Sequence, residues 1–164
     1  MKKQLHLFGI FFIAISLAFV SCDKDEDEDS NKTTSEYLRA GFWKTTAMTI
    51  DPGVNVGGVT LTDFFAQLEA CTKDDLIKFN SDGSITDDEG ATKCDVNDPQ
   101  TTTEGSWVLS ADNKMLTISY PGDDDISLTI TTINDNTLQG SYTVEEDFGS
   151  GLLLYTISVT LSRA

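Results

Sequence analysis

Apolar and polar residues alternate along the second half of the chain with a period of two. Between Met115 and Tyr120 the apolar positions are 116, 118 and 120, and a hydroxyl residue stands at 117 and at 119. The same alternation recurs over residues 126–131, 138–144 and 153–161. Because successive side chains of a strand point to opposite faces, the pattern indicates an antiparallel sheet with one buried and one solvated face.

Turn sequences rich in Gly, Asp and Asn separate the apolar runs and predict eight strands. The expected strands cover residues 41–50, 76–79, 84–86, 105–109, 115–120, 126–133, 137–145 and 152–162. An Asp51-Pro52-Gly53 turn is expected to end the first strand. Eight strands in consecutive order most simply close into an all-β up-and-down barrel, and an open sandwich is the alternative.

Residues 60–70 follow a helical rather than an alternating period. Their apolar positions fall at i, i+3, i+4 and i+7, namely Leu61, Phe64, Phe65 and Leu68. Thr60 and Asp63 have the spacing of a capping box, so the segment predicts one short helix after the first strand. Its apolar face is expected to cover an opening or edge of the sheet, either as a structural element or as a ligand lid.

The start of the chain has the pattern of an exported protein. Lys2 and Lys3 precede an apolar run over residues 7–20, which is short for a membrane span and typical of a signal peptide covering residues 1–21. The sequence FVSC ending at Cys22 resembles the lipobox of bacterial lipoproteins, which implies cleavage before Cys22 and lipidation of its thiol. The alternative is an ordinary secreted protein that begins with cysteine.

Residues 22–36 are predicted to form a disordered acidic tether, which leaves 37–164 as the folded domain. Six of the seven residues after Cys22 are acidic, so the segment repels itself and buries no apolar surface. The whole chain has a formal net charge of −16, which disfavours binding to nucleic acids and to anionic membrane surfaces. Attachment to a membrane is therefore expected through the N-terminal lipid anchor.

Cysteine and histidine usage narrows the chemistry. An exported chain matures in an oxidising compartment, so a disulfide between Cys71 and Cys94 is expected, and the absence of a CxxC pair argues against zinc. The single histidine, His6, lies in the signal peptide. The mature protein therefore lacks the imidazole that Ser-His-Asp catalysis and His-based metal sites require, and we expect no enzyme, cofactor or metal.

Two acidic patterns can be interpreted either as a functional site or as ordinary turn residues. Carboxylate pairs can hydrolyse glycosides, but the acids at 87–89 and 123–125 are interpreted as solvated turn residues. Residues 78–89 place Asn80, Asp82, Gly83 and Glu89 at calcium-loop spacing. Lys78 occupies the first ligand position of that loop, and a hairpin turn explains the segment without calcium.

Gly41-Phe42-Trp43 matches the Gly-x-Trp with which lipocalins begin their first strand. Further matches are CTKDDLIKFNSDGSI at 71–85, Cys94, and GSWVLSADNKMLTI at 105–118. Together they resemble the lipocalin-like domain of lipoproteins from Bacteroides-type bacteria. The resemblance implies an eight-stranded barrel with Trp43 as a plug at one end, and Arg163 is the candidate for the arginine that packs on this tryptophan in lipocalins.

The resemblance also implies a function and a location. A small apolar or amphipathic ligand is expected inside the barrel, and the candidate contacts are Tyr120, Leu128, Tyr142 and Tyr155, whose alternative role is ordinary core packing. A non-catalytic surface scaffold that binds glycan or protein through its outer face is the alternative function. Lys24, Asp25 and Glu26 resemble the signal that sends such lipoproteins to the outer face of the outer membrane.

Overall fold

The computed structural model describes residues 32–149 and 151–164. The expected signal peptide with His6, the lipidation site Cys22 and the export signal at Lys24, Asp25 and Glu26 lie outside these residues. The described part forms one unit that begins at Lys32. No helix in it has the length and the apolar composition needed to cross a bilayer.

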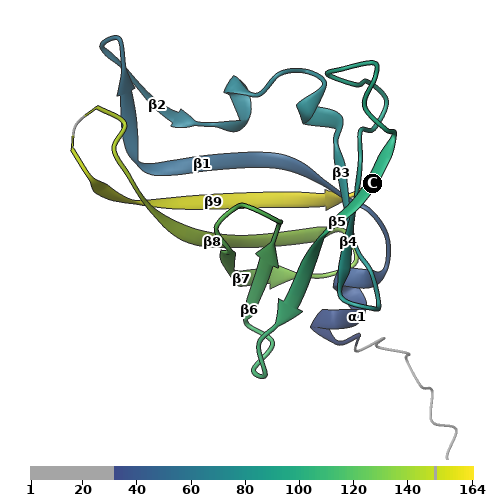
Figure 1. Ribbon diagram of the computed structural model, residues 1–164. Helices are drawn as coiled ribbons and strands as arrows, with labels where there is room; N and C mark the ends of the chain where they lie inside the picture. The colour runs from purple at the N-terminus through teal and green to yellow at the C-terminus, as the bar shows by residue number, and fades with distance from the viewer. Residues whose placement is uncertain (1–31, 150) are drawn as a thin grey trace, which may run out of the picture. The chain divides into compact units, whose positions relative to one another are not determined.

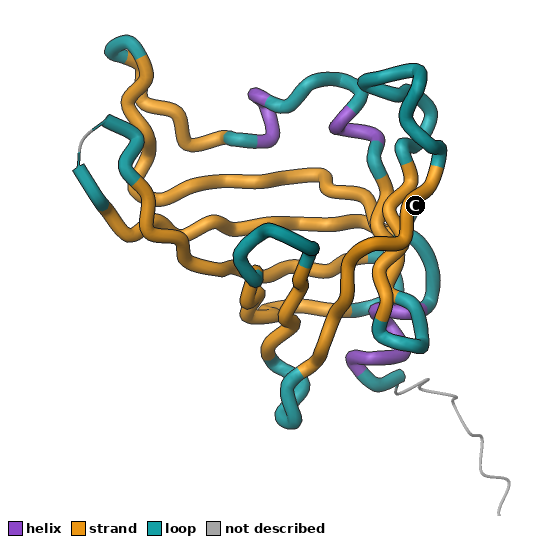
Figure 2. Tube along the Cα trace, in the orientation of Figure 1, coloured by secondary structure: helices purple, strands orange, loops and turns teal. Residues whose placement is uncertain are grey.

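The unit consists of one short helix followed by nine strands (Figures 1 and 2). In order they are α1 (Thr34–Arg39), β1 (Trp43–Val56), β2 (Val59–Asp63), β3 (Leu76–Phe79), β4 (Ser84–Asp88), β5 (Thr101–Leu109), β6 (Met115–Ser119), β7 (Ile126–Ile133), β8 (Thr137–Glu146) and β9 (Leu153–Arg163). Two short 3-10 helices, η1 (Phe65–Gln67) and η2 (Thr72–Asp74), lie between β2 and β3.

Eight of the strands close into an antiparallel barrel, which confirms the predicted fold class. Strands β3 to β9 follow one another around the wall, and β1 joins β3 to β9. Trp43 is paired with Ile77 of β3 on one side and with Arg163 of β9 on the other. The β1–β9 pairing continues to the pair Asp51 and Thr156, so long strands form one side of the barrel (Figure 1).

The ninth strand corrects the predicted helix at 60–70 and the predicted end of the first strand. Strand β1 continues past Pro52, where the pairing with β2 is irregular, and turns back at Gly57-Gly58. Both glycines have positive φ, of 61° and 88°, as a tight hairpin turn requires. The β-branched residues that follow pair with β1 as strand β2, and only Phe65–Gln67 adopts a 3-10 turn.

The helix of the unit precedes the first strand, so the fold begins before the expected boundary at residue 37. A capping box starts α1, in which the Glu36 backbone N–H donates to Thr33 Oγ1 and the Thr33 N–H donates to Glu36 Oε2 at 2.7 Å. Leu38 is fully buried. Burial of this one side chain against the barrel, together with the capping box, favours a helix where composition predicts a tether.

The hydrophobic core divides into two clusters. The larger is made of residues from α1 and from barrel strands: Leu38, Trp43, Phe79, Ile85, Trp107, Leu116, Leu128, Leu138 and Leu161. The smaller consists of Ile50, Val54, Tyr155 and Ile157, at the end of β1 that pairs with β2. Both clusters lie within residues 38–161, so the folded unit contains its own core.

Candidate functional site

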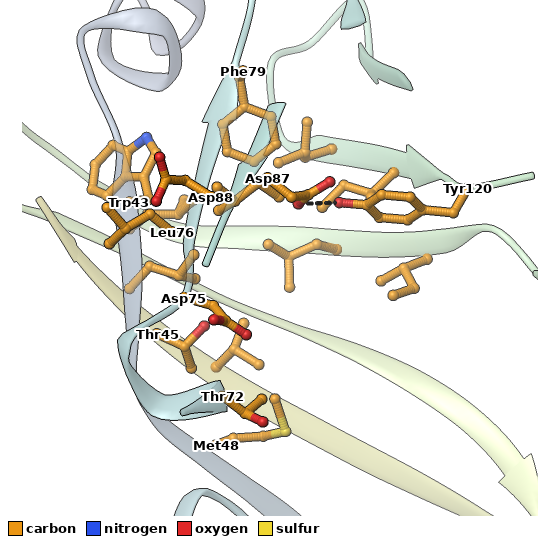
Figure 3. A pocket seen from close by; sticks show the side chains of 18 of the residues that line it. Trp43, Thr45, Met48, Thr72, Asp75, Leu76, Phe79, Asp87, Asp88 and Tyr120 are labelled. Atoms are coloured by element: carbon orange, nitrogen blue, oxygen red, sulfur yellow. Dashed lines mark hydrogen bonds between the residues drawn. The ribbon is translucent and has the colours of Figure 1, made fainter. Parts of the chain in front are cut away.

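A cavity of about 510 Å³ lies inside the barrel (Figure 3). Its wall is mainly aliphatic and includes Leu76, Ile118, Leu128, Leu138, Val159 and Leu161. These side chains point into the barrel. Because successive residues of a strand point to opposite faces, strands with apolar residues at every second position produce a continuous apolar lining. An interior of this size and character suits a small apolar molecule.

Trp43 lies on the cavity wall beside α1 and is fully buried. Its Nε1–H donates to the carbonyl of Leu38 at 2.9 Å, which ties the indole to the helix. The Arg163 guanidinium lies 3.7 Å from the centre of the indole ring and donates to the carbonyl of Tyr37 at 2.7 Å. The indole, the helix and the arginine together seal this end of the barrel.

The predicted ligand contacts are only partly brought together. Tyr120, Leu128 and Tyr142 line the cavity. Burial raises the pKa of Tyr142, and its phenol O–H can act as a hydrogen-bond donor. Tyr155 instead belongs to the smaller core cluster, where it packs edge to face on Phe148 with ring centroids 5.1 Å apart. At this end of β9 the Tyr155 side chain packs against Ile50 and Val54 of β1, so Tyr155 does not line the cavity.

Asp87 lies on the inner face of β4 and contacts Tyr120 (Figure 3). The Tyr120 hydroxyl donates to Asp87 Oδ1 at 2.7 Å. Burial raises the pKa of Asp87 despite this bond, and burial together with Asp87 raises the pKa of Tyr120. The interpretation of residue 87 as a solvated turn acid is therefore wrong, because β4 extends through it.

Gly105 of β5 makes this contact possible. A Cβ atom at this position would lie 2.7 Å from Cε1 of the Tyr120 ring, closer than van der Waals contact allows. Without a side chain, β5 leaves room for the ring to lie against its backbone on the way to β4. The phenol of Tyr120, which follows β6, therefore reaches the carboxylate of Asp87 on β4.

Asp75 is a second carboxylate on the cavity wall, immediately after η2. Its Oδ1 atom is buried and has no hydrogen-bond partner. Burial raises the pKa of Asp75, and the nearby carboxylates of Glu89, Asp74, Asp87 and Asp88 raise it further. Within the described part of the chain the only salt bridge joins Lys32 to Asp135, so Asp75 and Asp87 both lack a cationic side-chain partner.

The predicted disulfide between Cys71 and Cys94 is present and holds the segment that carries Asp75. The neighbouring Asp74 accepts hydrogen bonds from the backbone N–H of Ala91 at 3.0 Å and of Thr92 at 2.9 Å. Burial opposes ionisation of Asp74, but the hydrogen bonds from Thr92 and Ala91 outweigh it and lower the pKa. The loop after β4 is thus fixed against η2 by one covalent and several polar contacts.

The described residues contain one group of three side chains of metal-ligating type. Glu69 lies close to Cys71 and Cys94, but the two sulfur atoms are bonded to each other and are not free ligands. The calcium-like sequence forms the β3–β4 hairpin, in which Asp82 accepts a hydrogen bond from the backbone N–H of Ser84 at 3.0 Å. No group of three ligating side chains is found in this hairpin.

Sequence reasoning missed the position of Asp75 and Asp87 on the cavity wall. Extending the alternation of β4 by two residues from the buried Ile85 would have placed Asp87 on the inner face. Asp75 gives no such signal, because it lies outside the strands, after a 3-10 turn next to the disulfide. The chain has 27 acidic residues, most of which were interpreted as solvated, and Asp75 and Asp87 were not distinguished from them.

Replacing Asp75 with asparagine is expected to stabilise the unliganded protein at pH 7, modestly. A carboxyl whose pKa is raised by folding weakens the fold as the pH rises through that pKa. The stabilisation by asparagine should therefore become smaller as the pH is lowered toward 3.8, the ordinary pKa of an aspartate. Urea unfolding of both proteins at pH 7 and pH 4 measures this. Asp74→Asn is the matched control with the opposite sign, and a destabilising Asp75→Asn at pH 7 would contradict the prediction.

A family model described as "Lipocalin-like domain" matches residues 40–148. Among solved structures, bovine odorant-binding protein in complex with a selenium-containing odorant is similar, with 10% sequence identity and a TM-score of 0.41. The match covers 85% of this chain and 77% of that one. A search of curated proteins finds no match.

Proposed function

Since this chain belongs to the family of lipocalin-like domains, we propose that it binds a small apolar or amphipathic molecule inside its barrel. The observation that carries the proposal is the cavity of about 510 Å³, with its aliphatic wall and an end sealed by Trp43. Members of the lipocalin fold bind small hydrophobic ligands. A hollow interior supports this function over a scaffold that acts through its outer face.

The proposed role is non-catalytic. Lipocalin-like proteins are in general binding proteins, and the residues after the proposed signal peptide include no histidine. The polar groups of the cavity are carboxylates and phenols, which can orient a ligand by hydrogen bonds. Binding and release of an unchanged molecule therefore accounts for the site.

Filling the cavity tests the proposal. Ile118 lines the wall, and Ile118→Trp is expected to abolish the fluorescence increase of N-phenyl-1-naphthylamine, a neutral apolar probe, on addition of residues 23–164. The added indole takes the space that the probe needs, at a cost of about 1–3 kcal/mol in folding free energy. Val108→Ala, on the exposed face of β5, is the control. Probe binding that is absent from the wild type, or unchanged in Ile118→Trp, would refute the proposal.

The same proposal places the protein at the outer surface of the outer membrane, attached through lipid on Cys22. The lipobox-like sequence and the acidic run that follows it support this location. Cys22→Ala is expected to abolish metabolic labelling by a radioactive fatty acid, and the wild type should be digested when intact cells are treated with protease. Labelling that survives in Cys22→Ala would contradict the anchor, and protection of the wild type would contradict the surface location.

A further inference from the structure

We propose that the ligand of this cavity is an organic cation, with an amine or ammonium group beside Asp75 and Asp87 and an apolar body in the barrel. The inference rests on the proposed function and adds the chemical class of the ligand. Both carboxylates line the same cavity but come from different segments, since Asp75 immediately follows η2 and Asp87 belongs to β4.

The first argument is the state of the two carboxylates. Asp75 Oδ1 is buried and accepts no hydrogen bond, although a buried oxygen of this kind costs free energy when it is left without a partner. Asp87 Oδ1 accepts from the Tyr120 hydroxyl, which fixes the direction of the carboxylate. A donor on a bound ligand would satisfy the oxygen of Asp75, and Asp87 offers an oriented acceptor on the wall of the same cavity.

The second argument is charge. Asp75, Asp87, Asp88 and Glu89 all line the cavity. Among the residues that the structure describes, none of the four forms a salt bridge with lysine or arginine. A fatty acid or another anionic amphiphile would bring a fifth negative charge to this end of the cavity. A cationic group instead supplies the missing counter-charge and donates charge-assisted hydrogen bonds.

The third argument separates an organic cation from a metal ion. The described carboxylates of the cavity do not form a group of three oxygens close enough to ligate one ion. Most of the wall is aliphatic, as Leu116, Leu128 and Leu138 show, and such side chains leave a hydrated metal ion without partners. A molecule with a charged head and an apolar body matches both parts of the lining.

Competition between three ligands of equal chain length tests the inference. Decylamine is cationic at pH 7, 1-decanol is neutral and decanoate is anionic, and each displaces N-phenyl-1-naphthylamine from residues 23–164 if it enters the cavity. Decylamine is expected to bind about tenfold to a hundredfold more tightly than 1-decanol, as one or two charge-assisted hydrogen bonds provide. Decanoate is expected to bind most weakly.

Neutral variants assign the preference to the two carboxylates. The double variant Asp75→Asn, Asp87→Asn should lose the advantage of decylamine over 1-decanol, and continued displacement of the probe by 1-decanol would show that the cavity is intact. Asp124→Asn, in the exposed turn between β6 and β7, is the matched control and should keep the wild-type order. If the double variant does not fold, Asp75→Asn alone decides, because Asp75 Oδ1 has no hydrogen bond to lose.

The outcomes separate this inference from the proposed function. If the probe and 1-decanol bind but decylamine binds no better than 1-decanol, the cationic ligand is refuted and the apolar cavity stands. If the double variant keeps the preference for decylamine, the carboxylates are not its cause and the inference is wrong. If neither the probe nor any of the three ligands binds, both the proposed function and the inference fail.

Discussion

Replacing Trp43 with alanine is expected to reduce the free energy of unfolding by about 3–5 kcal/mol, the range for truncation of a buried large aromatic residue. The side chain is fully buried, and its Nε1–H donates to the carbonyl of Leu38 at 2.9 Å. Truncation leaves a void under α1, removes the aromatic face on which Arg163 lies and leaves the Leu38 carbonyl without this donor. The sealed end of the barrel therefore loses three contacts at once.

Chemical denaturation followed by circular dichroism measures the effect, because the variant also removes one of the two tryptophan fluorophores. Trp43→Phe, which retains a large ring but no donor, should fall between the wild type and Trp43→Ala. Val108→Ala removes an exposed side chain from the outer face of β5 and should change the stability by less than about 0.5 kcal/mol. A loss below about 1 kcal/mol for Trp43→Ala would show that this end of the barrel is held by other contacts.

Removing the disulfide is the second change that is expected to lower the stability strongly. The double variant Cys71→Ser, Cys94→Ser is expected to lose about 3 kcal/mol, since the bond closes a loop with a sequence separation of 23 and so restricts the unfolded chain. The native structure also loses the covalent link between η2 and the loop after β4. We expect the segment that carries Asp75 to become more mobile than the strands of the barrel.

Urea midpoints of the oxidised wild type, the reduced wild type and the double variant measure this effect. The reduced wild type should match the variant, and a reducing agent should leave the variant unchanged. Hydrogen exchange should increase most over residues 71–75 and 90–94. Equal midpoints for the oxidised and reduced wild type would contradict the prediction, and so would an effect of the reducing agent on the variant.

The barrel was predictable from sequence because its strands obey a local rule. The alternation places Leu116 and Leu128 inside, where they are partners in the β6–β7 register. The helix at 60–70 failed because the spacing of Leu61 and Phe64 also arises where a strand ends in a 3-10 turn. The decisive signal was the Gly57-Gly58 turn just before it, which returns the chain along β1.

The candidate site was predictable only in its apolar part. Tyr120 and Tyr142 follow from the alternation of their strands. Tyr155 shares that alternation but lies outside the cavity, in the smaller core cluster. Asp75 follows η2 next to the disulfide, and Asp87 lies on β4, which continues beyond the predicted strand end at residue 86. The alternation of β4 could have indicated Asp87, whereas no local pattern distinguishes Asp75 from the solvated acids of a chain with a net charge of −16.

Gly105 contributes no side chain to the cavity, yet the position of Tyr120 depends on it. A methyl group there would meet the ring at 2.7 Å and move the phenol away from Asp87. The polar chemistry of the barrel can therefore change through a residue that no ligand touches. A lipocalin-like chain with a larger amino acid aligned to this glycine is expected to lack the hydrogen bond between phenol and carboxylate. The residue at this one position of a sequence alignment therefore predicts which relatives have that hydrogen bond.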